Sequence, residues 1–176
     1  VLDLSDFKVP AVFDYLYEFF HRDFVARSVT IGSSIYVDPG WQGKKDGKEE
    51  IFWHITTREK KKKVKRGKHL VEIKSRPFDP ERSCRIEWVR PMMLNYDHES
   101  IKLFYKKETR GKKPIRLYLW AHRHDFVVIM QKLGKSRSYL VTSFYITESY
   151  KRDSYQRWYL EYRAGNNPEL EGCEWF

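Results

Sequence analysis

The chain of 176 residues has the length of one domain with a substantial core, so we expect a single domain over 1–176. Its 34 Lys and Arg against 24 Asp and Glu leave a formal net charge of +10, which favours an anionic partner, nucleic acid first and an anionic membrane surface second. No apolar run approaches the roughly 20 residues that span a bilayer, and no signal peptide is recognisable, which predicts a soluble, cytoplasmic protein with no membrane-inserted segment.

The first third of the chain predicts one helix and two strands. Apolar residues recur every three or four positions over Asp6–Phe24, which predicts an amphipathic helix with Pro10 in its first turn. β-Branched residues over Ser28–Val37 predict a strand, and the polar segment Gln42–Glu50, with two glycines, predicts a mobile connection. We expect Ile51–Ile55 to form a second short strand that ends at a polar rim.

His54 is the best single candidate for a reactive group. It lies among the apolar residues of Ile51–Ile55 and is followed by Thr56, Thr57 and Arg58. Because an unperturbed imidazole has a pKa of ~6.5, it can accept and return a proton near neutral pH, which suits general acid or base catalysis at such a rim. A hydrogen-bonded histidine in an aromatic core explains the same pattern, so both interpretations stay open.

A dense run of cations follows His54. It consists of Arg58, Lys60, Lys61, Lys62, Lys63, Lys65, Arg66 and Lys68. These charges repel one another, so we expect a disordered arm that a polyanion neutralises, placed to attract phosphates beside His54; a solvated loop is the alternative. Leu70–Ile73, directly after the arm, predicts an edge strand.

The central part of the chain predicts a helix with two candidate phosphate-binding residues. Asp79 suits an N-cap before a helix over Pro80–Asn95, which Pro91 limits or kinks. Arg82 and Arg85, three positions apart, lie on neighbouring parts of one helix face, and two guanidiniums together can clamp a phosphate. Ion pairs with neighbouring glutamates would account for both arginines equally well.

The last part predicts a sheet followed by a helix. Four apolar segments separated by turn signals predict an antiparallel meander: Ile101–Tyr105, Ile115–Ala121, Phe126–Met130 and Tyr139–Ile146. Regular alternation in the last segment puts Ser143 and Tyr145 on one face and Thr142 on the other. Aromatic residues at helical spacing predict a helix over Lys151–Arg163, after which Trp175 and Phe176 could tuck back onto the body.

Together these elements predict an α+β fold. We expect a twisted antiparallel sheet at 28–150 that is covered by an N-terminal helix within 1–27, the central helix, and a C-terminal helix within 151–176. Cys84 and Cys173 are too few for a disulfide framework or a zinc site by themselves, and His122 and His124 have no further ligand at metal-binding spacing. We therefore expect no metal and no cofactor.

Four segments also carry a family resemblance. They are Phe52-Trp53-His54-Ile55, Glu81-Arg82-Ser83-Cys84-Arg85-Ile86-Glu87-Trp88, Leu117-Tyr118-Leu119-Trp120, and Tyr139-Leu140-Val141-Thr142-Ser143-Phe144-Tyr145-Ile146. This pattern resembles the phage and toxin nucleases of the barnase–EndoU–colicin–RelE superfamily. The resemblance covers roughly 29–150 and implies a helical N-terminal portion, a twisted antiparallel sheet, and RNA cleavage without a metal.

The resemblance also implies roles for individual residues. His54 takes the histidine position, Arg82 or Arg85 the basic position, and the late strand supplies a hydroxyl. The family's late-strand motif ends in tyrosine, but Thr142-Ser143-Phe144 has phenylalanine there, while Ser143-Phe144-Tyr145 restores the tyrosine in a shifted register. Both alignments stay open, so Thr142, Ser143 and Tyr145 are all candidates.

The chemistry expected of such a site is cleavage of RNA by its own ribose 2′-OH. His54 serves as base or acid, Arg82 and Arg85 hold the phosphate, and a late-strand hydroxyl donates a hydrogen bond. The expected partners are RNA, with tRNA as one possibility, and an inhibitor or antitoxin protein. Two other classes remain open: a non-catalytic RNA- or DNA-binding module, and a scaffold or phage-assembly protein whose basic face meets an acidic partner.

Overall fold

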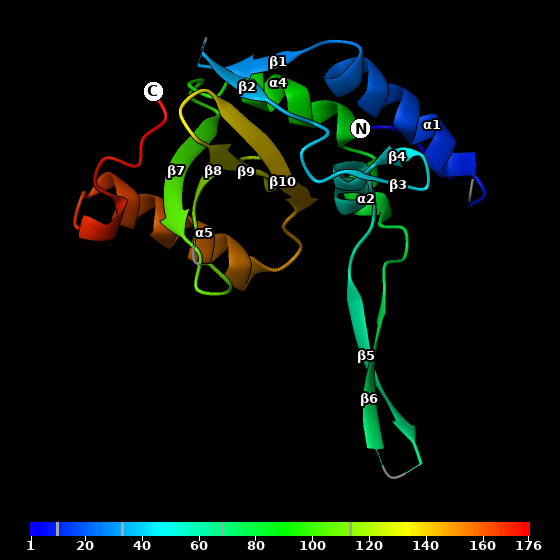
Figure 1. The fold of residues 1–176 in the computed structure, drawn as a ribbon. Coiled ribbons are helices and arrows are strands. Elements are labelled where there is room, and N and C mark those ends of the chain that lie inside the picture. Colours follow the sequence, from blue (N-terminus) through cyan, green and yellow to red (C-terminus); the bar gives the residue numbers. More distant parts are fainter. Residues whose placement is uncertain (10, 33, 68, 113) are drawn as a thin grey trace.

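A six-stranded sheet forms the centre of the fold in the computed structural model, which describes residues 1–9, 11–32, 34–67, 69–112 and 114–176 (Figure 1). The strand order is β1-β2-β10-β9-β8-β7. Three predicted positions lie outside the described residues: Pro10 in a helix, Ser33 in a strand and Lys68 in the basic run. The α+β class is confirmed.

Four of the strands form the predicted meander. They are β7 (Ile101–Lys107), β8 (Ile115–Ala121), β9 (Phe126–Leu133) and β10 (Arg137–Tyr145). Each pairs antiparallel with the next, which confirms the four predicted segments. His122 and His124 lie in the turn between β8 and β9. One neighbouring pair departs from the expected antiparallel sheet, because β2 runs parallel to β10.

The predicted single strand over Ser28–Val37 is wrong, because the segment forms a tight hairpin of two strands. β1 (Val29–Ile31) and β2 (Ile35–Val37) pair antiparallel. Gly32 begins the turn with a φ of +58°, a left-handed conformation that glycine adopts without steric cost. Its missing side chain also makes room for Phe176, whose ring would lie 2.4 Å from a Cβ there. The C-terminal residues therefore tuck back as expected, and Trp175 is buried.

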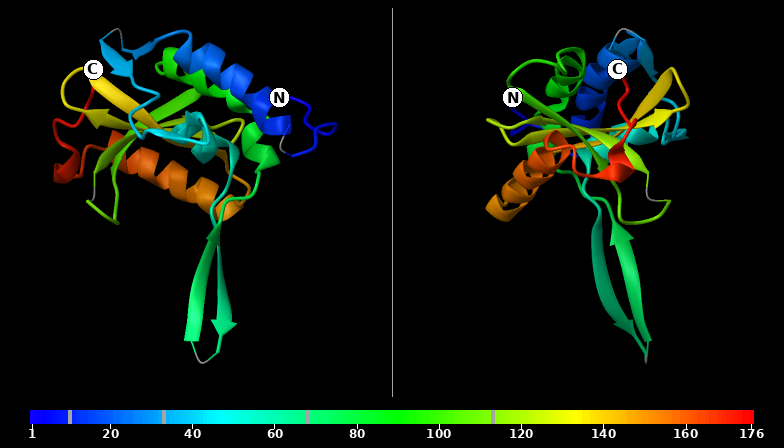
Figure 2. Two further views of the ribbon diagram at one scale, coloured as in Figure 1. Left: turned by 45° about the vertical axis from the view of Figure 1, so that its right-hand side comes forward. Right: turned by 90° about the vertical axis from the view of Figure 1, so that its left-hand side faces the viewer.

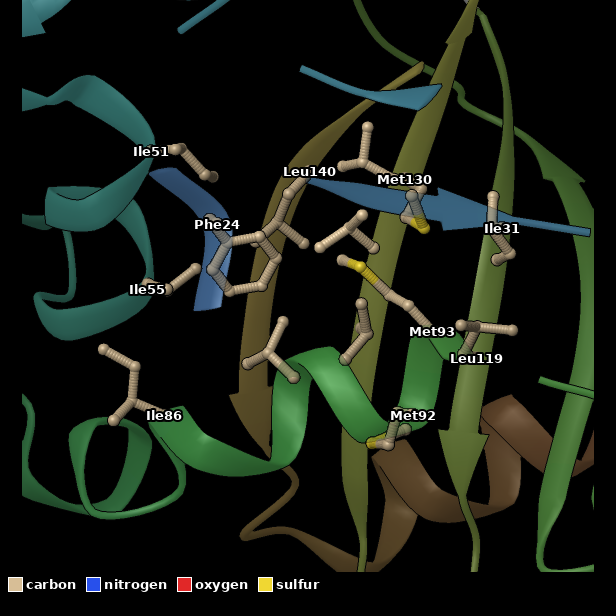
Figure 3. Close-up of a cluster of buried hydrophobic side chains, with 14 of the residues drawn as sticks. Phe24, Ile31, Ile51, Ile55, Ile86, Met92, Met93, Leu119, Met130 and Leu140 are labelled. Atoms are coloured by element: carbon tan, nitrogen blue, oxygen red, sulfur yellow. The ribbon is translucent and has the colours of Figure 1, made fainter. Parts of the chain in front are cut away.

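Helices cover both faces of the sheet and bury two cores. The large core lies between the sheet and the helices α1 (Ala11–Phe20), α2 (Glu50–Thr56) and α4 (Val89–Leu94). Figure 3 shows part of it, with Ile51 and Ile55 of α2 facing Leu140 of β10. The small core lies on the opposite face, where α5 (Ser149–Arg163) packs Tyr155 against Tyr118 and Trp120. The predicted C-terminal helix is confirmed. The N-terminal helix predicted over Asp6–Phe24 is confirmed from Ala11 on, whereas 6–9 are not helical, and α1 continues into the π-helical turn η1 (His21–Val25).

The predicted strand over Ile51–Ile55 is wrong, because this segment lies in the helix α2. Short apolar runs do not separate strand from helix by their pattern, and the burial of Ile51, Phe52 and Ile55 follows one helix face. Phe52 packs edge to face against Tyr17 and other aromatic rings of α1. This packing decides the conformation, since only a helix places all three side chains on the large core.

The predicted continuous helix over Pro80–Asn95 is also wrong, although its start is confirmed. Three short pieces replace it: α3 (Pro80–Ser83), the 3₁₀ turn η2 (Ile86–Trp88) and α4. Asp79 caps α3 as predicted, because its Oδ1 accepts a hydrogen bond from the Arg82 N–H at 3.2 Å. The break falls at Arg85, where φ is −110° and ψ is 16°, and not at Pro91, which lies in the first turn of α4 and has no N–H to leave unpaired.

The expected mobile connection and the expected disordered arm both contain strands. Within Gln42–Glu50, β3 (Lys44–Lys45) pairs with β4 (Lys48–Glu49), and Trp53 donates to the Lys45 carbonyl at 2.9 Å. The basic run forms β5 (Lys60–Arg66), which pairs with β6 (His69–Ser75), the strand predicted at Leu70–Ile73. Figures 1 and 2 show this hairpin projecting away from the rest of the molecule. Pairing with β6 satisfies main-chain groups that a disordered segment would leave to water.

In the part of the chain that is described, no helix combines the length and apolar character needed to cross a membrane. The longest helix, α5, spans 15 residues and carries charged side chains throughout. The C-terminal segment after α5 contains only the short 3₁₀ turn η3 (Pro168–Leu170).

Candidate active site

His54 lies on the side of α2 that faces away from the large core. Its side chain is 31% exposed, and its Nε2 lies 3.4 Å from the carboxylate of Glu50, one helical turn earlier. A carboxylate only accepts hydrogen bonds, so a neutral imidazole that presents Nε2–H to Glu50 has its lone pair on Nδ1. The histidine is therefore oriented by its own helix and still reachable from solvent.

The surroundings of His54 favour its neutral form. Burial lowers the pKa of His54 from its ordinary value, and the nearby positive charges of Arg76 and Arg82 lower it further. The negative charge of Glu50 acts in the opposite direction without reversing the shift. At neutral pH the imidazole is mostly unprotonated, which suits a general base better than a general acid.

Arg82 holds together three segments that are distant in sequence. Its guanidinium donates to the carbonyl of His54 and, at 3.1 Å, to the carbonyl of Thr57. The same Nη1 lies 3.4 Å from Thr142 Oγ1 on β10. The first two bonds satisfy carbonyls at the C-terminal end of α2, which have no partner within the helix. Arg82 thus positions the helix that carries His54 and connects it with the late strand.

This position lowers the pKa of Arg82, although the guanidinium stays charged at neutral pH. Its side chain is only 12% exposed, and burial lowers its pKa to about 10, with Arg58 and Arg76 adding to the shift and Asp79 opposing it. Arg82 Nε is buried and, within the described ranges, has no hydrogen-bond partner. Because its Nη1 is used by main-chain carbonyls, this guanidinium has less capacity left for a substrate than the sequence suggests.

Arg85 makes a separate set of contacts. Its guanidinium lies over the ring of Tyr145, 4.2 Å from the centroid, and it donates to the carboxylate of Glu81 at 3.1 Å. The break after α3 separates its environment from that of Arg82, so within the described ranges the two guanidiniums share no hydrogen-bond partner. The ion pair with Glu81 corresponds to the alternative interpretation of Arg85.

A β-bulge decides how the three late-strand hydroxyls face. The pairing of β10 with β9 shifts between Leu140 and Thr142, so Leu140 pairs with Met130 and Thr142 with Ile129. The predicted placement of Ser143 and Tyr145 on one face and Thr142 on the other is confirmed. Regular alternation would also put Leu140 on the face of Thr142, and this is wrong, because Leu140 faces the large core and Thr142 the opposite side. Thr142 meets Arg82, Tyr145 lies under Arg85, and the Oγ of Ser143 is buried.

Two further cations stand at the root of the hairpin. Arg58 pairs with Asp79 at 2.7 Å, and the Nε of Arg76 donates to Thr57 Oγ1 at 3.2 Å. An isolated β-bridge between Thr57 and Phe78 closes the root between them. Arg76 was not among the predicted residues, because only the hairpin pairing returns it to the side of Arg58. Glu50 was missed as well, since an i, i+4 contact to His54 exists only if the segment is a helix.

The remaining predicted binding residues lie along the hairpin. Lys60, Lys61, Lys62, Lys63, Lys65 and Arg66 are all exposed on β5. Lys61 lies 3.5 Å from Glu72 on the facing strand. The basic run thus forms one strand of a hairpin that begins six residues after His54.

Comparisons with known protein families, with curated proteins and with solved structures found no match. Within the described ranges, no three His, Cys, Asp or Glu side chains gather in a way that could hold a metal ion.

Proposed function

We propose that this protein is a metal-independent endoribonuclease that cleaves RNA by attack of the ribose 2′-OH on the neighbouring phosphodiester. The observation that supports it best is the half-buried His54, whose imidazole contacts Glu50 and whose carbonyl accepts a hydrogen bond from Arg82, next to the root of a basic hairpin where Arg76 bonds Thr57. A neutral imidazole provides the base, and guanidiniums provide the positive charge that the reacting phosphate needs.

In this proposal His54 Nδ1 accepts the proton of the 2′-OH. The 2′-oxygen then attacks phosphorus and closes a 2′,3′-cyclic phosphate, while the 5′-oxygen leaves as an alcohol after taking a proton from the imidazolium or from water. Arg58 and Arg76, which are 43% and 30% exposed, neutralise the charge that develops on the phosphate oxygens. Arg82 acts mainly by holding the α2 carbonyls, and Thr142 offers a hydroxyl beside it.

The family resemblance agrees with this assignment of roles. His54, Arg82 and Thr142 stand at the histidine, basic and hydroxyl positions of the superfamily pattern, and Arg82 links the other two. Membership in the barnase–EndoU–colicin–RelE superfamily is part of the proposal, together with a toxin or phage role, an inhibitor protein as partner, and action in the cytoplasm. Of the two possible alignments of the late strand, the geometry supports the one that uses Thr142.

A non-catalytic nucleic-acid-binding module is the second candidate. It is favoured by the use of Arg82 on main-chain carbonyls and by the concentration of positive charge on a hairpin away from the sheet. In that case His54 would be a structural residue that bonds Glu50. A scaffold with an acidic protein partner, the third class, predicts weak binding to RNA even at low salt.

Cleavage of total RNA in excess EDTA tests the proposal. We expect wild type to cut RNA and leave 2′,3′-cyclic phosphate ends, and His54→Ala to bind RNA normally but cut at least ~10²-fold more slowly, because the proton transfer is lost. His21→Ala, which removes an exposed histidine on η1, is the matched control and should cut like wild type. Circular dichroism checks that all three proteins are folded. Equal cleavage by wild type and His54→Ala would remove His54 from the mechanism, and no cleavage by folded wild type would favour the binding module.

A further inference from the structure

The hairpin of β5 and β6, residues 60–75, is here called the basic arm. It holds eight Lys and Arg against a single acid, Glu72, so these 16 residues carry a formal charge of +7 out of the +10 of the whole chain. Seven residue pairs form its ladder, which makes each strand roughly 23 Å long at ~3.3 Å per residue. The net positive charge of the protein is therefore largely a property of one thin projecting element.

The arm has little internal reason to be stable. Apart from Val64, all its described side chains are exposed, including Leu70 at 71%. Lys61 and Lys74 lie directly opposite each other, and like charges in such pairs destabilise a ladder. A two-stranded hairpin without a packed face is marginal in water. A polyanion that neutralises these charges would stabilise the arm, because it would remove the repulsion between its lysines and arginines.

Both faces of the arm carry cations. Cross-strand partners share a face and successive residues alternate, so the pairing register separates the side chains into two sets. One face carries Lys61, Lys63, Lys65 and Lys74, and the other carries Lys60, Lys62 and Arg66. A flat anionic surface would contact only one of these faces. A groove with a phosphate wall on each side would contact both.

The arm also has the dimensions of a groove-binding element. Its two strands lie ~4.8 Å apart, and a two-stranded ribbon fits the major groove of B-DNA, which is ~12 Å wide. In an RNA helix the corresponding groove is deep and narrow, so a ribbon enters it where the helix opens at a loop or bulge. The ribbon would therefore enter a paired stem at the end that adjoins unpaired nucleotides.

The root of the arm connects this groove with the proposed catalytic histidine. The Thr57–Phe78 bridge and the Arg58–Asp79 ion pair fix the arm to the ends of α2 and α3, and β5 begins six residues after His54. Attack by a 2′-OH requires that oxygen to stand in line with the departing 5′-oxygen, a geometry that the regular backbone of a stem does not present. A stem held by the arm would therefore place an unpaired nucleotide at His54.

We propose that the substrate class is RNA with a base-paired stem next to unpaired nucleotides, in which the basic arm enters the opened groove of the stem and the unpaired strand is cut at His54. This inference rests on the proposed ribonuclease activity for the cleavage step, whereas stem binding by the arm is tested separately. The stem supplies affinity through its phosphates, and the loop supplies the flexible bond that is cut.

The test measures binding in EDTA with His54→Ala as the parent protein, so that the RNA stays intact. The probes are an RNA stem–loop, a single-stranded RNA of the same length that cannot pair, and a DNA duplex with the sequence of the stem. The arm variant adds Lys61→Gln, Lys63→Gln and Lys65→Gln, all on one face. The control variant instead adds Arg27→Gln, Arg123→Gln and Lys135→Gln, three exposed cations outside the arm.

We expect the parent protein to bind the stem–loop at least ~10-fold more tightly than the single strand, because only a stem offers two phosphate walls. The arm variant should bind the stem–loop on the order of 10²-fold more weakly at ~0.1 M salt. Its negative slope of log K against log salt should become shallower by about 2. The control variant should keep both values. Equal affinity for the stem–loop and the single strand, an unaffected arm variant, or tighter binding of the DNA duplex would each overturn the inference.

A shortened arm gives an independent test. Lys63 pairs directly with Glu72, so replacing 64–71 by Asn-Gly closes the same ladder with a two-residue turn and removes the outer half of the arm. We expect this variant to lose the preference for the stem–loop over the single strand while circular dichroism shows a folded body. Retained preference would contradict the role of the arm. Arm-dependent binding together with no RNA cleavage by wild type would overturn the ribonuclease proposal and leave a stem-binding surface.

Discussion

Replacing Arg82 by methionine tests the structural role that its contacts assign to it. Methionine keeps much of the length of the side chain but removes every donor. The carbonyls of His54 and Thr57 then lose a charged hydrogen-bond donor at the buried end of α2. Hydrogen bonds to charged groups contribute ~1.5–3 kcal/mol each, so the gross loss is about 3–6 kcal/mol.

Part of that loss is offset in the variant. The substitution removes the cost of burying a guanidinium whose Nε, within the described residues, makes no hydrogen bond and only a long 3.8 Å ion pair with Asp79; leaving such a group buried costs ~1–3 kcal/mol. We therefore expect the free energy of unfolding to fall by about 2–3 kcal/mol, which lowers the melting temperature by roughly 4–12 °C in a chain of this size.

Urea unfolding followed by circular dichroism measures this change. The m-value should stay constant, since the surface exposed on unfolding is nearly the same. Arg58→Met is the matched control: its guanidinium is 43% exposed, and the buried Asp79 that it leaves keeps Arg82 as a partner, so its loss should cost less than that of Arg82. A loss below ~1 kcal/mol for Arg82→Met would refute the structural role. Unchanged stability with abolished RNA cleavage would instead mean that Arg82 acts on the substrate phosphate.

Two further predictions concern the site. If His54 is the base, kcat/KM rises with pH through its pKa, which is lowered from the ordinary ~6.5, so the acid limb should lie below pH 6.5. Glu50→Gln should move this limb to lower pH, because the negative charge that favours the imidazolium is lost. Arg76→Gln should move it to higher pH, because a positive charge that disfavours the imidazolium is lost. Shifts of opposite sign in a pH–rate profile would exclude His54 as the base. Thr142→Val should slow RNA cleavage with little change in urea stability, whereas Ser143→Ala should be neutral or slightly stabilising, because its Oγ is buried and, within the described part of the chain, has no partner. Equal cleavage rates for these two variants would remove Thr142 from the site.

The sequence by itself determined the elements whose patterns are long and regular. The meander strands, the helix that begins near Ala11 and the C-terminal helix all follow from periodicity, because a single buried face imposes a period of two on strands and of 3.6 on helices. The cap at Asp79 was predictable for another local reason, since its carboxylate satisfies an N–H only a few residues away. The positive charge beside His54 was evident from composition.

The tertiary structure decided everything that depends on partners distant in sequence. Ile51–Ile55 is helical because Phe52 packs among the rings of α1, and the bulge in β10 turns Thr142 away from the large core. Arg82 reaches the carbonyl of His54, 28 residues away, and the hydroxyl of Thr142, 60 residues away. No local pattern encodes such contacts, because their free energy exists only once separate elements have packed together.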